Sequence, residues 1–510
     1  MVYNQTETGG IIIKDYYQDG SFLGIKPMGN LHRYAVNGKI AGSIAAIAEI
    51  QNSQPILHAP VGCGFHYRTS ARTRFSPNYR LEVTNIKSHE IIFGGEEKLK
   101  EEIKKADRCK QPDLIVILSS CVSAITNDDL AGIVQSEQAN TKAKLICVQS
   151  EVFSHPNKNS SIKRLKEKVE HSGEKRAPSK VQYQGCGFIE VMNALTEQVM
   201  QPQKVVPGTV NIESFAWGYG GAEKLRRVRD TLDKINIAVN CFLPTATVKQ
   251  IETAPQAELN IVRRIRWAQK MKQHFNTPYL HFPSLDDWHG IEGIRDFYVL
   301  IAEQFGREKG MEKILQQEWQ AIQPRLVTVR EYLGQLRYVL VSQSLSTLPE
   351  LIRLYEIHYC MPLSAICLLL PDSYSRELGV DEEVVKKMFT NVDKALAETE
   401  SKAQLFMNPS DTELHAIFKQ ADCIVGTNNP RFEGRGAAVL PAVHDYRPLD
   451  YEGYVTALEN VAQKIQSRKE KNKLLLSRLL FSQHFYPLLE DKDCLASREM
   501  WMRMWRMRAL

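Results

Sequence analysis

The chain has 510 residues, of which 43% are hydrophobic and 24% are charged, and its formal net charge is +6. At about 150 residues per domain this length predicts about three domains, because one hydrophobic core does not extend over so long a chain. The small net charge does not require a nucleic-acid partner. The first residues lack a secretory signal pattern, and no apolar run approaches the roughly 18 residues of a membrane span. We therefore expect a cytoplasmic protein of ordinary globular composition, with no nucleic-acid or membrane partner.

The chain contains ten cysteines. Disulfide frameworks belong to oxidising compartments, so cysteines in a long chain without a secretory signal are expected to be free thiols or metal ligands. None of them forms a CxxC pair. A metal cluster would therefore collect its cysteines from distant parts of the fold or from a second chain.

Residues 1–205 show the pattern of a first Rossmann-like domain. Strands are predicted over 55–58, 114–118 and 145–148, and helices over 39–50, over 96–105 and from Gly185. Short apolar strands that alternate with longer helical segments are typical of βαβ units and a parallel sheet. Residues 126–129 predict the start of one more helix, because Thr, Asn and Asp favour the N-cap. The basic, aperiodic stretch 155–182 is interpreted as a solvent-exposed loop of this domain.

The same strand–helix pattern restarts twice, after a linker marked by Pro202, Pro207 and Gly208. A second Rossmann-like domain is expected over 206–333 and a third over 334–453. Residues 454–510 are expected to form a helical C-terminal tail that packs on another domain or on a partner chain. The further strands are predicted over 209–212, 235–242, 336–341, 362–370, 404–406 and 421–426. The predicted fold class is α/β, with three Rossmann-like domains, parallel sheets and this tail.

Cys63 and Cys121 each follow a predicted strand, in turns of glycine or serine. Ligands gather at the carboxyl ends of strands in a doubly wound sheet, and small residues let the backbone approach a bulky group. Iron–sulfur clusters take thiolates, and backbone N–H groups nearby stabilise their negative charge. Two interpretations follow from this pattern: cluster ligands, or buried free cysteines, a state that cysteine favours. The spacing alone favours the second.

Other candidate residues carry weaker patterns. Cys186 stands at a predicted helix start and is a candidate reactive thiol, and His444 follows an apolar run and either faces a pocket or is a surface or core residue. The glycine-rich turn 218–221 suggests a nucleotide, but the chain has neither GxxxxGK[ST] nor GxGxxG with its downstream acid. ATP binding through a P-loop is therefore not expected. The strand cysteines expected to lie in the core are Cys147, Cys367 and Cys423.

Several segments combine into a pattern of their own. They read HAPVGCG at 58–64, FGGEEKL at 93–99, PDLIVILSSC at 112–121 and ITNDDL at 125–130, with weaker counterparts at 258–262, 422–426 and 451–454. In this order and spacing they resemble component 1 of nitrogenase and its relatives. That family includes the two chains of the molybdenum–iron protein, the cofactor-assembly scaffold chains and the dark-operative protochlorophyllide and chlorophyllide reductases.

The resemblance implies that Cys63 and Cys121 are cluster ligands at a subunit interface, which reverses the preference from spacing alone. Asn37 stands where the family has its first cluster cysteine. A half-site of two cysteines implies a [4Fe–4S] cluster completed by a partner subunit, rather than the eight-iron cluster of nitrogenase. The glycines expected to bring the backbone close to this cofactor are Gly62, Gly64, Gly94 and Gly95.

Further departures from the family concern the substrate region. Arg264 replaces the cysteine that holds the cofactor in the alpha chain, and His444 corresponds to the family's histidine beside the cofactor. Cys186 or Gly187 stands in place of the active-site histidine, so no FeMo-cofactor is expected. An arginine does not ligate iron but pairs with a carboxylate-bearing substrate or an anionic cofactor; the alternative is a surface salt bridge. Arg264, His444 and Cys186 are the catalytic candidates.

The resemblance implies an oxidoreductase subunit of a nitrogenase-like two-component reductase. An ATP-dependent iron protein, which alone binds ATP, would dock near Cys63 and Cys121 and pass electrons through the shared cluster to a small-molecule substrate. A second component 1 chain, either a paralogue or a second copy, would complete a dimer or heterotetramer. The alternatives are a scaffold for metallocluster assembly that does not turn over and a cluster-free structural subunit.

Overall fold

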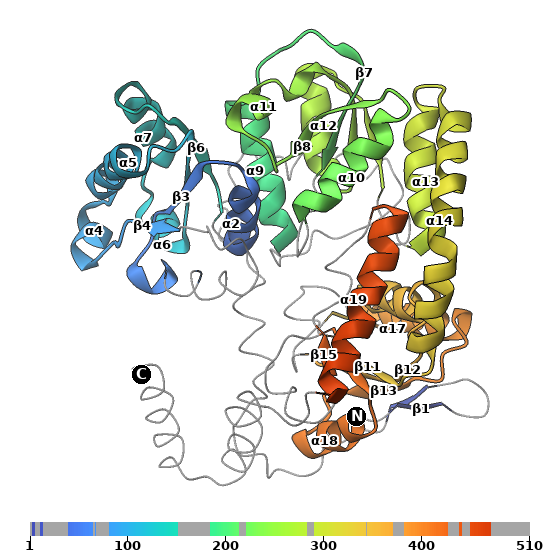
Figure 1. Ribbon diagram of the computed structural model, residues 1–510. Coiled ribbons are helices and arrows are strands. Elements are labelled where there is room, and N and C mark those ends of the chain that lie inside the picture. Colours follow the sequence, from blue (N-terminus) through green and yellow to red (C-terminus); the bar gives the residue numbers. More distant parts are fainter. Residues whose placement is uncertain are drawn as a thin grey trace.

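Three parallel sheets follow one another along the chain in a computed structural model of the protein (Figure 1). The structure describes residues 3–5, 11–13, 39–64, 67, 81–150, 184–213, 221–282, 290–342, 344–370, 382–426, 438–440 and 449–470. Predictions that concern Asn37, the loop at 155–182, the turn at 218–220, His444 and the chain after 470 lie outside the described residues. No described helix combines the length and apolar character that a membrane crossing requires.

The first sheet has the order β4–β3–β5–β6, and all its strands are parallel. Its strands are β3 (Ser53–Leu57), β4 (Glu82–Val83), β5 (Leu114–Leu118) and β6 (Lys144–Val148). The helices of this part are α2 (Lys39–Glu49), α4 (Ser88–Phe93), α5 (Glu96–Lys110), α6 (Cys121–Thr126), α7 (Leu130–Glu137) and α9 (Gln184–Gln198), with a 3₁₀ turn, η1 (Gln138–Asn140). Every residue of β5 is buried, as expected for an inner strand of a parallel sheet. The three strands predicted here are confirmed within two residues.

Two helix boundaries differ from the sequence prediction for local reasons. α5 continues five residues past the predicted end at 105, and it closes with Gln111 in a left-handed conformation. Of residues 126–129, which were predicted to start a helix, only Asp129 is the N-cap of the next helix. Asp129 caps α7 by accepting from the Gly132 nitrogen at 2.9 Å, whereas Thr126 ends α6.

The helices α2 and α9 cross with their backbones in direct contact. A Cβ atom added to Gly187 of α9 would lie 1.9 Å from the Lys39 carbonyl oxygen and 2.5 Å from the Ser43 nitrogen of α2. The Ser43 hydroxyl also donates to the Gly187 carbonyl oxygen at 3.2 Å. Glycine at this position is therefore a packing requirement, and the start of α9 is fixed against α2.

The second sheet has the order β10–β9–β7–β8 and is also parallel. Its strands are β7 (Val206–Glu213), β8 (Ala238–Leu243), β9 (Ala257–Val262) and β10 (Tyr279–His281). Its helices are α10 (Gly221–Asp233), α11 (Val248–Glu252), α12 (Ile265–Phe275), α13 (Gly290–Glu303) and α14 (Glu308–Gly334), with a 3₁₀ turn, η2 (Ala254–Gln256). Part of the predicted linker is wrong: Pro207 and Gly208 lie inside β7, where the pairing register with β9 shifts. A bulge accommodates residues that otherwise indicate a turn.

The third sheet has the order β13–β12–β11–β14–β15. Its strands are β11 (Tyr338–Ser342), β12 (Leu363–Leu368), β13 (Gln404–Met407), β14 (Cys423–Val425) and β15 (Ala438–Leu440). The helices are α15 (Leu348–Arg353), continued by a π-helical turn η3 (Leu354–His358), α17 (Glu382–Glu398), α18 (Asp411–Lys419) and α19 (Tyr451–Glu470). A short antiparallel pair, β1 (Tyr3–Gln5) and β2 (Ile11–Ile13), lies beside β13. Cys367 and Cys423 are buried as predicted, but Cys147 is only partly buried.

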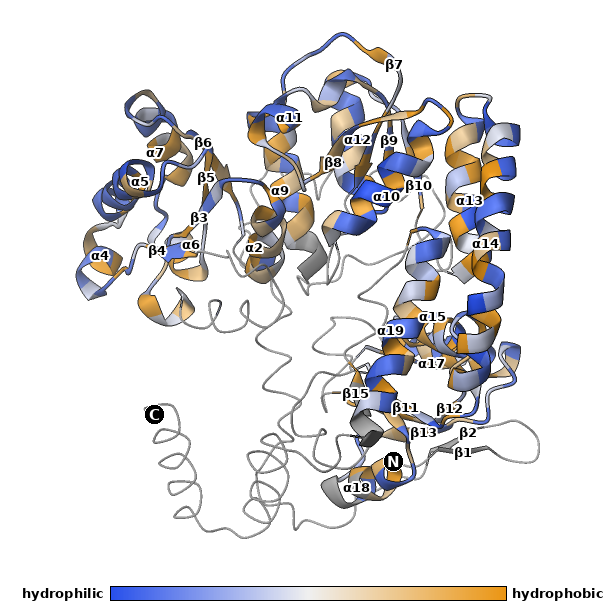
Figure 2. Ribbon diagram, in the orientation of Figure 1, coloured by the Kyte–Doolittle hydropathy of each residue, from blue (hydrophilic) through white to orange (hydrophobic). Residues whose placement is uncertain are grey.

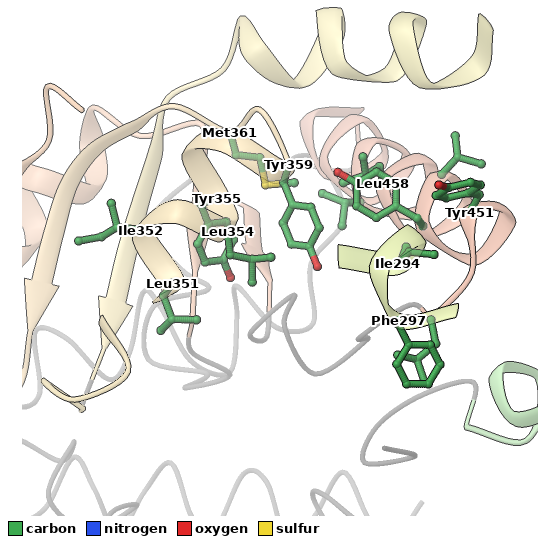
Figure 3. Packing of buried hydrophobic residues seen from close by; sticks show 14 of the residues in the cluster. Ile294, Phe297, Leu351, Ile352, Leu354, Tyr355, Tyr359, Met361, Tyr451 and Leu458 are labelled. Carbon is green, nitrogen blue, oxygen red and sulfur yellow. The ribbon is translucent and has the colours of Figure 1, made fainter. Parts of the chain in front are cut away.

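The last described helix, α19, joins the second and third parts of the chain. It runs along α14 (Figure 1), and Arg325 of α14 donates to the carboxylates of Glu452 and Glu459. Figure 3 shows Tyr451 and Leu458 of α19 in the cluster that also contains Ile294 and Phe297 of α13. The helices carry hydrophilic and hydrophobic bands (Figure 2), as amphipathic helices that cover a core do. The predicted packing of the helical tail on another domain is confirmed for its described part.

Replacing Gly187 by alanine tests the close crossing of α2 and α9. The helices must separate to admit the methyl group, so we expect Gly187→Ala to lower the free energy of unfolding by about 1–3 kcal/mol, the usual cost of overpacking. Urea unfolding measures this loss. The matched control is Gly310→Ala in α14, whose added methyl would meet only the Ile235 side chain at 3.6 Å. Equal stability of the two variants would contradict the crossing.

Candidate functional site

Cys63 and Cys121 lie at the carboxyl edge of the first sheet, after two neighbouring strands. β3 leads into a helical turn at 61–64 that contains Cys63, and β5 leads into α6, which Cys121 opens. Both thiols are partly buried. Burial raises the pKa of Cys63, and the charge of Cys121 raises it further, so the two sulfur atoms are close enough to interact electrostatically. The structure therefore brings together the two cysteines that the sequence singled out.

Tyr67 is a third member of this group. Burial raises the pKa of Tyr67 to about 12, and the charges of Cys63 and Cys121 add to the shift. The phenol therefore stays protonated at neutral pH and keeps an O–H donor beside the two thiols. Sequence reasoning missed this residue, although its place four positions after Cys63, one helical turn, was an available signal.

The four glycines predicted beside a cofactor have different structural reasons. A Cβ on Gly64 would lie 2.3 Å from the Val83 side chain, and a Cβ on Gly95 would lie 2.9 Å from the His58 ring. Gly94 has a φ of +96°, which favours glycine. Gly62 is the one of these four glycines at which an added Cβ would meet nothing within 4 Å. Protein packing or backbone conformation thus accounts for three of these glycines, and Gly62 alone leaves room beside Cys63.

A buried histidine–aspartate pair lies behind the cysteine turns. His58, fully buried, places Nε2 3.1 Å from Asp128 Oδ2 and Nδ1 3.1 Å from Thr84 Oγ1. Asp128 also accepts from the Gly95 nitrogen at 3.1 Å and from the Thr126 hydroxyl at 2.7 Å. Burial lowers the pKa of His58, although the neighbouring Asp128 opposes this shift. The sequence motifs contain both residues, but nothing in the sequence indicated that they pair.

The surface beside this edge carries an exposed group of apolar side chains, which we call the apolar rim. Its exposed fractions reach 72% at Ile92, 75% at Phe93 and 74% at Ile125. The rim comprises Val61, Ile91, Ile92, Phe93 and Ile125. It spans the turn before Cys63, α4 and α6, and α4 lies against α6. Exposed apolar side chains that gather on neighbouring elements are a mark of interaction surfaces.

Arg264, a catalytic candidate, pairs with a carboxylate of the chain itself. Its guanidinium donates to Glu213 at the end of β7, whose side chain is fully buried, and it stacks on the Phe188 ring of α9, 4.1 Å from the centroid. Glu213 also accepts from the backbone nitrogens of Arg263 at 3.0 Å and Arg264 at 2.9 Å, and from Trp267 Nε1 at 3.0 Å. Four donors compensate the buried carboxylate. This partner is neither a substrate nor a surface acid.

The other two catalytic candidates are placed only in part. Cys186 lies in the first turn of α9, two positions before Phe188, and the structure describes its backbone alone. Gly187, the alternative counterpart of the family's active-site histidine, contacts the backbone of α2. His444 lies outside the described residues. Of the three catalytic candidates, the structure thus places only the Arg264 side chain, which lies against α9.

Two comparisons with known sequences agree with this arrangement. A family model described as nitrogenase component 1 type oxidoreductase matches residues 39–466. The nitrogenase iron–molybdenum cofactor biosynthesis protein NifE of Methanosarcina barkeri is 24% identical over 310 residues, which cover 57% of this chain and 60% of that protein. A light-independent protochlorophyllide reductase chain of Synechocystis sp. is 24% identical over 284 residues, which cover 54% of this chain and 52% of that protein. The chain thus spans about half the length of the curated relatives it matches.

A solved structure shows the same fold. Nitrogenase Cp1 at pH 6.5 superposes on the chain with a TM-score of 0.60 at 17% identity, covering 86% of this chain and 90% of that chain. At this identity the likeness concerns the fold alone. It confirms the predicted α/β class with three parallel sheets.

The variant Glu213→Gln tests the buried pair with Arg264. The neutral amide leaves the guanidinium, whose side chain is 19% exposed, without its charged partner. We expect a loss of about 3 kcal/mol of unfolding free energy, as when one member of a buried ion pair is removed. Chemical unfolding followed by circular dichroism measures it. Glu223→Gln, which removes the charge that pairs with Arg226 and Arg227 at the surface, should change the unfolding free energy much less than Glu213→Gln does. If Glu213→Gln had the wild-type unfolding free energy, the ion pair between Glu213 and Arg264 would not contribute to stability.

Proposed function

Because the chain belongs to the nitrogenase component 1 type oxidoreductase family, we propose that it is a nitrogenase-like component 1 subunit that holds half of a [4Fe–4S] cluster through Cys63 and Cys121. The observation that carries this proposal is the pair of partly buried thiols that follow two adjacent parallel strands at one edge of the sheet. Within the described ranges no group of three or more His, Cys, Asp or Glu side chains is placed to hold a metal ion. A second chain would supply the remaining ligands.

The donor set fits such a group. Thiolates are the ligands that iron–sulfur clusters take, and the open space at Gly62 beside Cys63 leaves room for a partner chain. A bound cluster supplies one-electron oxidation and reduction at this edge of the sheet. The raised pKa of Cys63 means that its thiol must release a proton on ligation, so low pH opposes metal loading. Tyr67 keeps its phenol protonated beside the sulfurs and offers them a donor.

The electron donor in this proposal is a separate ATP-dependent iron protein. The chain has no P-loop sequence of its own, so ATP would be bound by that partner only. The apolar rim is the proposed docking surface. Its Val61 and Ile125 lie on the turn and the helix that carry the two cysteines, and α4, which carries its other side chains, lies against α6. Docking there would shorten the electron-transfer path from the iron protein to Cys63 and Cys121. A second component 1 chain, a paralogue or a copy, would complete the oligomer.

The substrate of this proposal is a small molecule reduced in the region of Arg264, Cys186 and His444. Glu213 holds the Arg264 guanidinium in place, so the cation is oriented before a substrate arrives. An arginine supplies no ligand for iron, and this argues against a FeMo-cofactor at that position. Similarity to the NifE cofactor biosynthesis protein favours one alternative, a scaffold for metallocluster assembly without turnover. A cluster-free structural subunit is the other alternative.

Iron content of the cysteine variants tests the cluster. Cys63→Ala and Cys121→Ala should each reduce the iron and sulfide that copurify anaerobically with the chain and its partner to background, because a half-site of two ligands does not tolerate loss of one. Cys109→Ala is the control, since Cys109 is an exposed thiol at the end of α5. Wild-type protein without iron beside its partner would end the redox proposal. Turnover with the iron protein and ATP then separates an enzyme from a scaffold.

A charge on the apolar rim tests docking. We expect Phe93→Glu to weaken binding of the cognate iron protein by about 2 kcal/mol or more, the loss typical of a central apolar anchor. Biolayer interferometry with the iron protein and a non-hydrolysable ATP analogue measures this affinity. Val327→Glu, at a residue that is 50% exposed on α14, is the matched control. An unchanged affinity of Phe93→Glu for the iron protein would contradict docking at the apolar rim.

A further inference from the structure

The hydrogen bonds of His58 form one continuous chain with a defined direction. Asp128 as a carboxylate only accepts, so His58 Nε2 carries the proton and donates to it. Burial lowers the pKa of His58 and keeps the ring neutral, which makes Nδ1 an acceptor for the Thr84 hydroxyl. The same hydroxyl oxygen accepts from the Ala59 nitrogen at 3.1 Å. Every polar atom of the ring therefore has a partner of the right kind.

This chain of hydrogen bonds holds the backbone before each cysteine. Ala59, whose nitrogen donates to the Thr84 hydroxyl, is followed by the turn that contains Cys63. The His58 carbonyl oxygen accepts from the Ser120 hydroxyl at 2.6 Å, and Ser120 directly precedes Cys121. Ser120 also caps α6 by accepting from the Ser123 nitrogen. The two cysteine turns are thus joined at His58, the first through its ring and Thr84 and the second through its backbone carbonyl oxygen.

The aspartate extends the connection to the apolar rim. Asp128 Oδ1 accepts from the nitrogen of Gly95, the N-cap of α5, and Gly95 is two residues after Phe93. The His58 ring lies so close to Gly95 that a Cβ there would meet its Nε2 and Cε1 atoms at 2.9 Å. A shift of the segment that carries Phe93 therefore presses on the ring or pulls on the carboxylate. The side-chain hydrogen bonds described for Asp128, to His58, Gly95 and Thr126, all lie at this edge of the sheet.

We propose that His58 and Asp128 are positioning residues that set the relative placement of the Cys63 and Cys121 turns and couple it to the apolar rim. The inference rests on the proposed function in one respect, that the two thiols are ligands of a shared cluster. A displacement of Phe93 on contact with a partner is passed through Gly95, Asp128 and His58 to the turns that carry both sulfur ligands. Groups that orient metal ligands from behind commonly change metal affinity about 10- to 100-fold when they are removed.

Thiol reactivity tests the positioning without any metal. In the cluster-free full chain, iodoacetamide alkylation of Cys63 and Cys121 is followed by peptide mass spectrometry, with the exposed Cys109 as internal reference. We expect Asp128→Ala to change both rates relative to Cys109 by about tenfold, the effect of losing a buried hydrogen bond to a charged group. Asp128→Asn should restore near wild-type rates, because the amide accepts from Gly95 and donates to a ring whose proton moves to Nδ1.

A matched variant separates positioning from general loss of structure. Asp107→Ala removes another carboxylate of the same part of the chain, which accepts from the backbone nitrogens of Lys142 and Ala143, away from the cysteines. It should lower the thermal midpoint without changing the two rates. Unchanged rates in Asp128→Ala, equal changes in Asp107→Ala, or no rescue by Asp128→Asn would each overturn the proposal.

Reconstitution distinguishes this inference from the proposed function. After anaerobic incubation with iron and sulfide beside the partner chain, the EPR g-values of the reduced Asp128→Ala protein should differ from those of wild type, and those of Asp107→Ala should not. Identical spectra would overturn the coupling to the cluster. Wild-type protein that takes up no iron defeats the proposed function, whereas the alkylation rates still decide whether His58 and Asp128 position the thiols.

Discussion

The parallel pairing of β3 with β5 is the constraint on which the candidate site depends. Its register sets Leu57 opposite Leu118, so the two strands end level and the chain leaves the sheet twice at one edge. Each buried aliphatic side chain of β5 contributes roughly 1.5–3 kcal/mol, and a slip by one residue would exchange the two faces of the strand. The register is therefore strongly fixed. Cys63 and Cys121 lie at the same edge of the sheet because this register holds.

Two buried carboxylates complete the arrangement at the sheet edges. Asp128 joins the connections after β3, α4 and α6, while Glu213 joins the start of α12 to β7 and, through the stacked Arg264, to Phe188 of α9. A buried charge is tolerated only where donors surround it, and both carboxylates meet that condition. Asp128 acts within the first part of the chain. Glu213 fixes how the second part lies against the first.

The sequence predicted what depends on local pattern. Apolar runs located β5 and the other inner strands, and the spacing of motifs identified the family, which the matched model confirms. The fold class needed no more than the alternation of strands and helices. The predicted element boundaries were wrong where one residue type occurs in two kinds of structure. Gly208 indicates a turn in the sequence but lies in β7, where the pairing register with β9 shifts.

Long-range partners could not be predicted in the same way. His58 and Asp128 are 70 residues apart, and Glu213 and Arg264 are 51 apart, so only the folded sheets show that they pair. The catalytic role of Arg264 stays a prediction, and its partner within the chain, Glu213, was not foreseen. Tyr67 was missed because a tyrosine four residues after one cysteine is not by itself a site signal. The fold shows that Cys121 also acts on its phenol.

The stoichiometry of iron in the protein tests the central claim most directly. Mössbauer spectroscopy of ⁵⁷Fe-enriched protein, purified anaerobically with and without its partner chain, identifies the cluster type and counts clusters for each chain. The account predicts one [4Fe–4S] cluster for each pair of chains and none on the chain alone, because Cys63 and Cys121 supply only part of the ligands. A complete cluster on the isolated chain, or a pair of chains without iron, would contradict it.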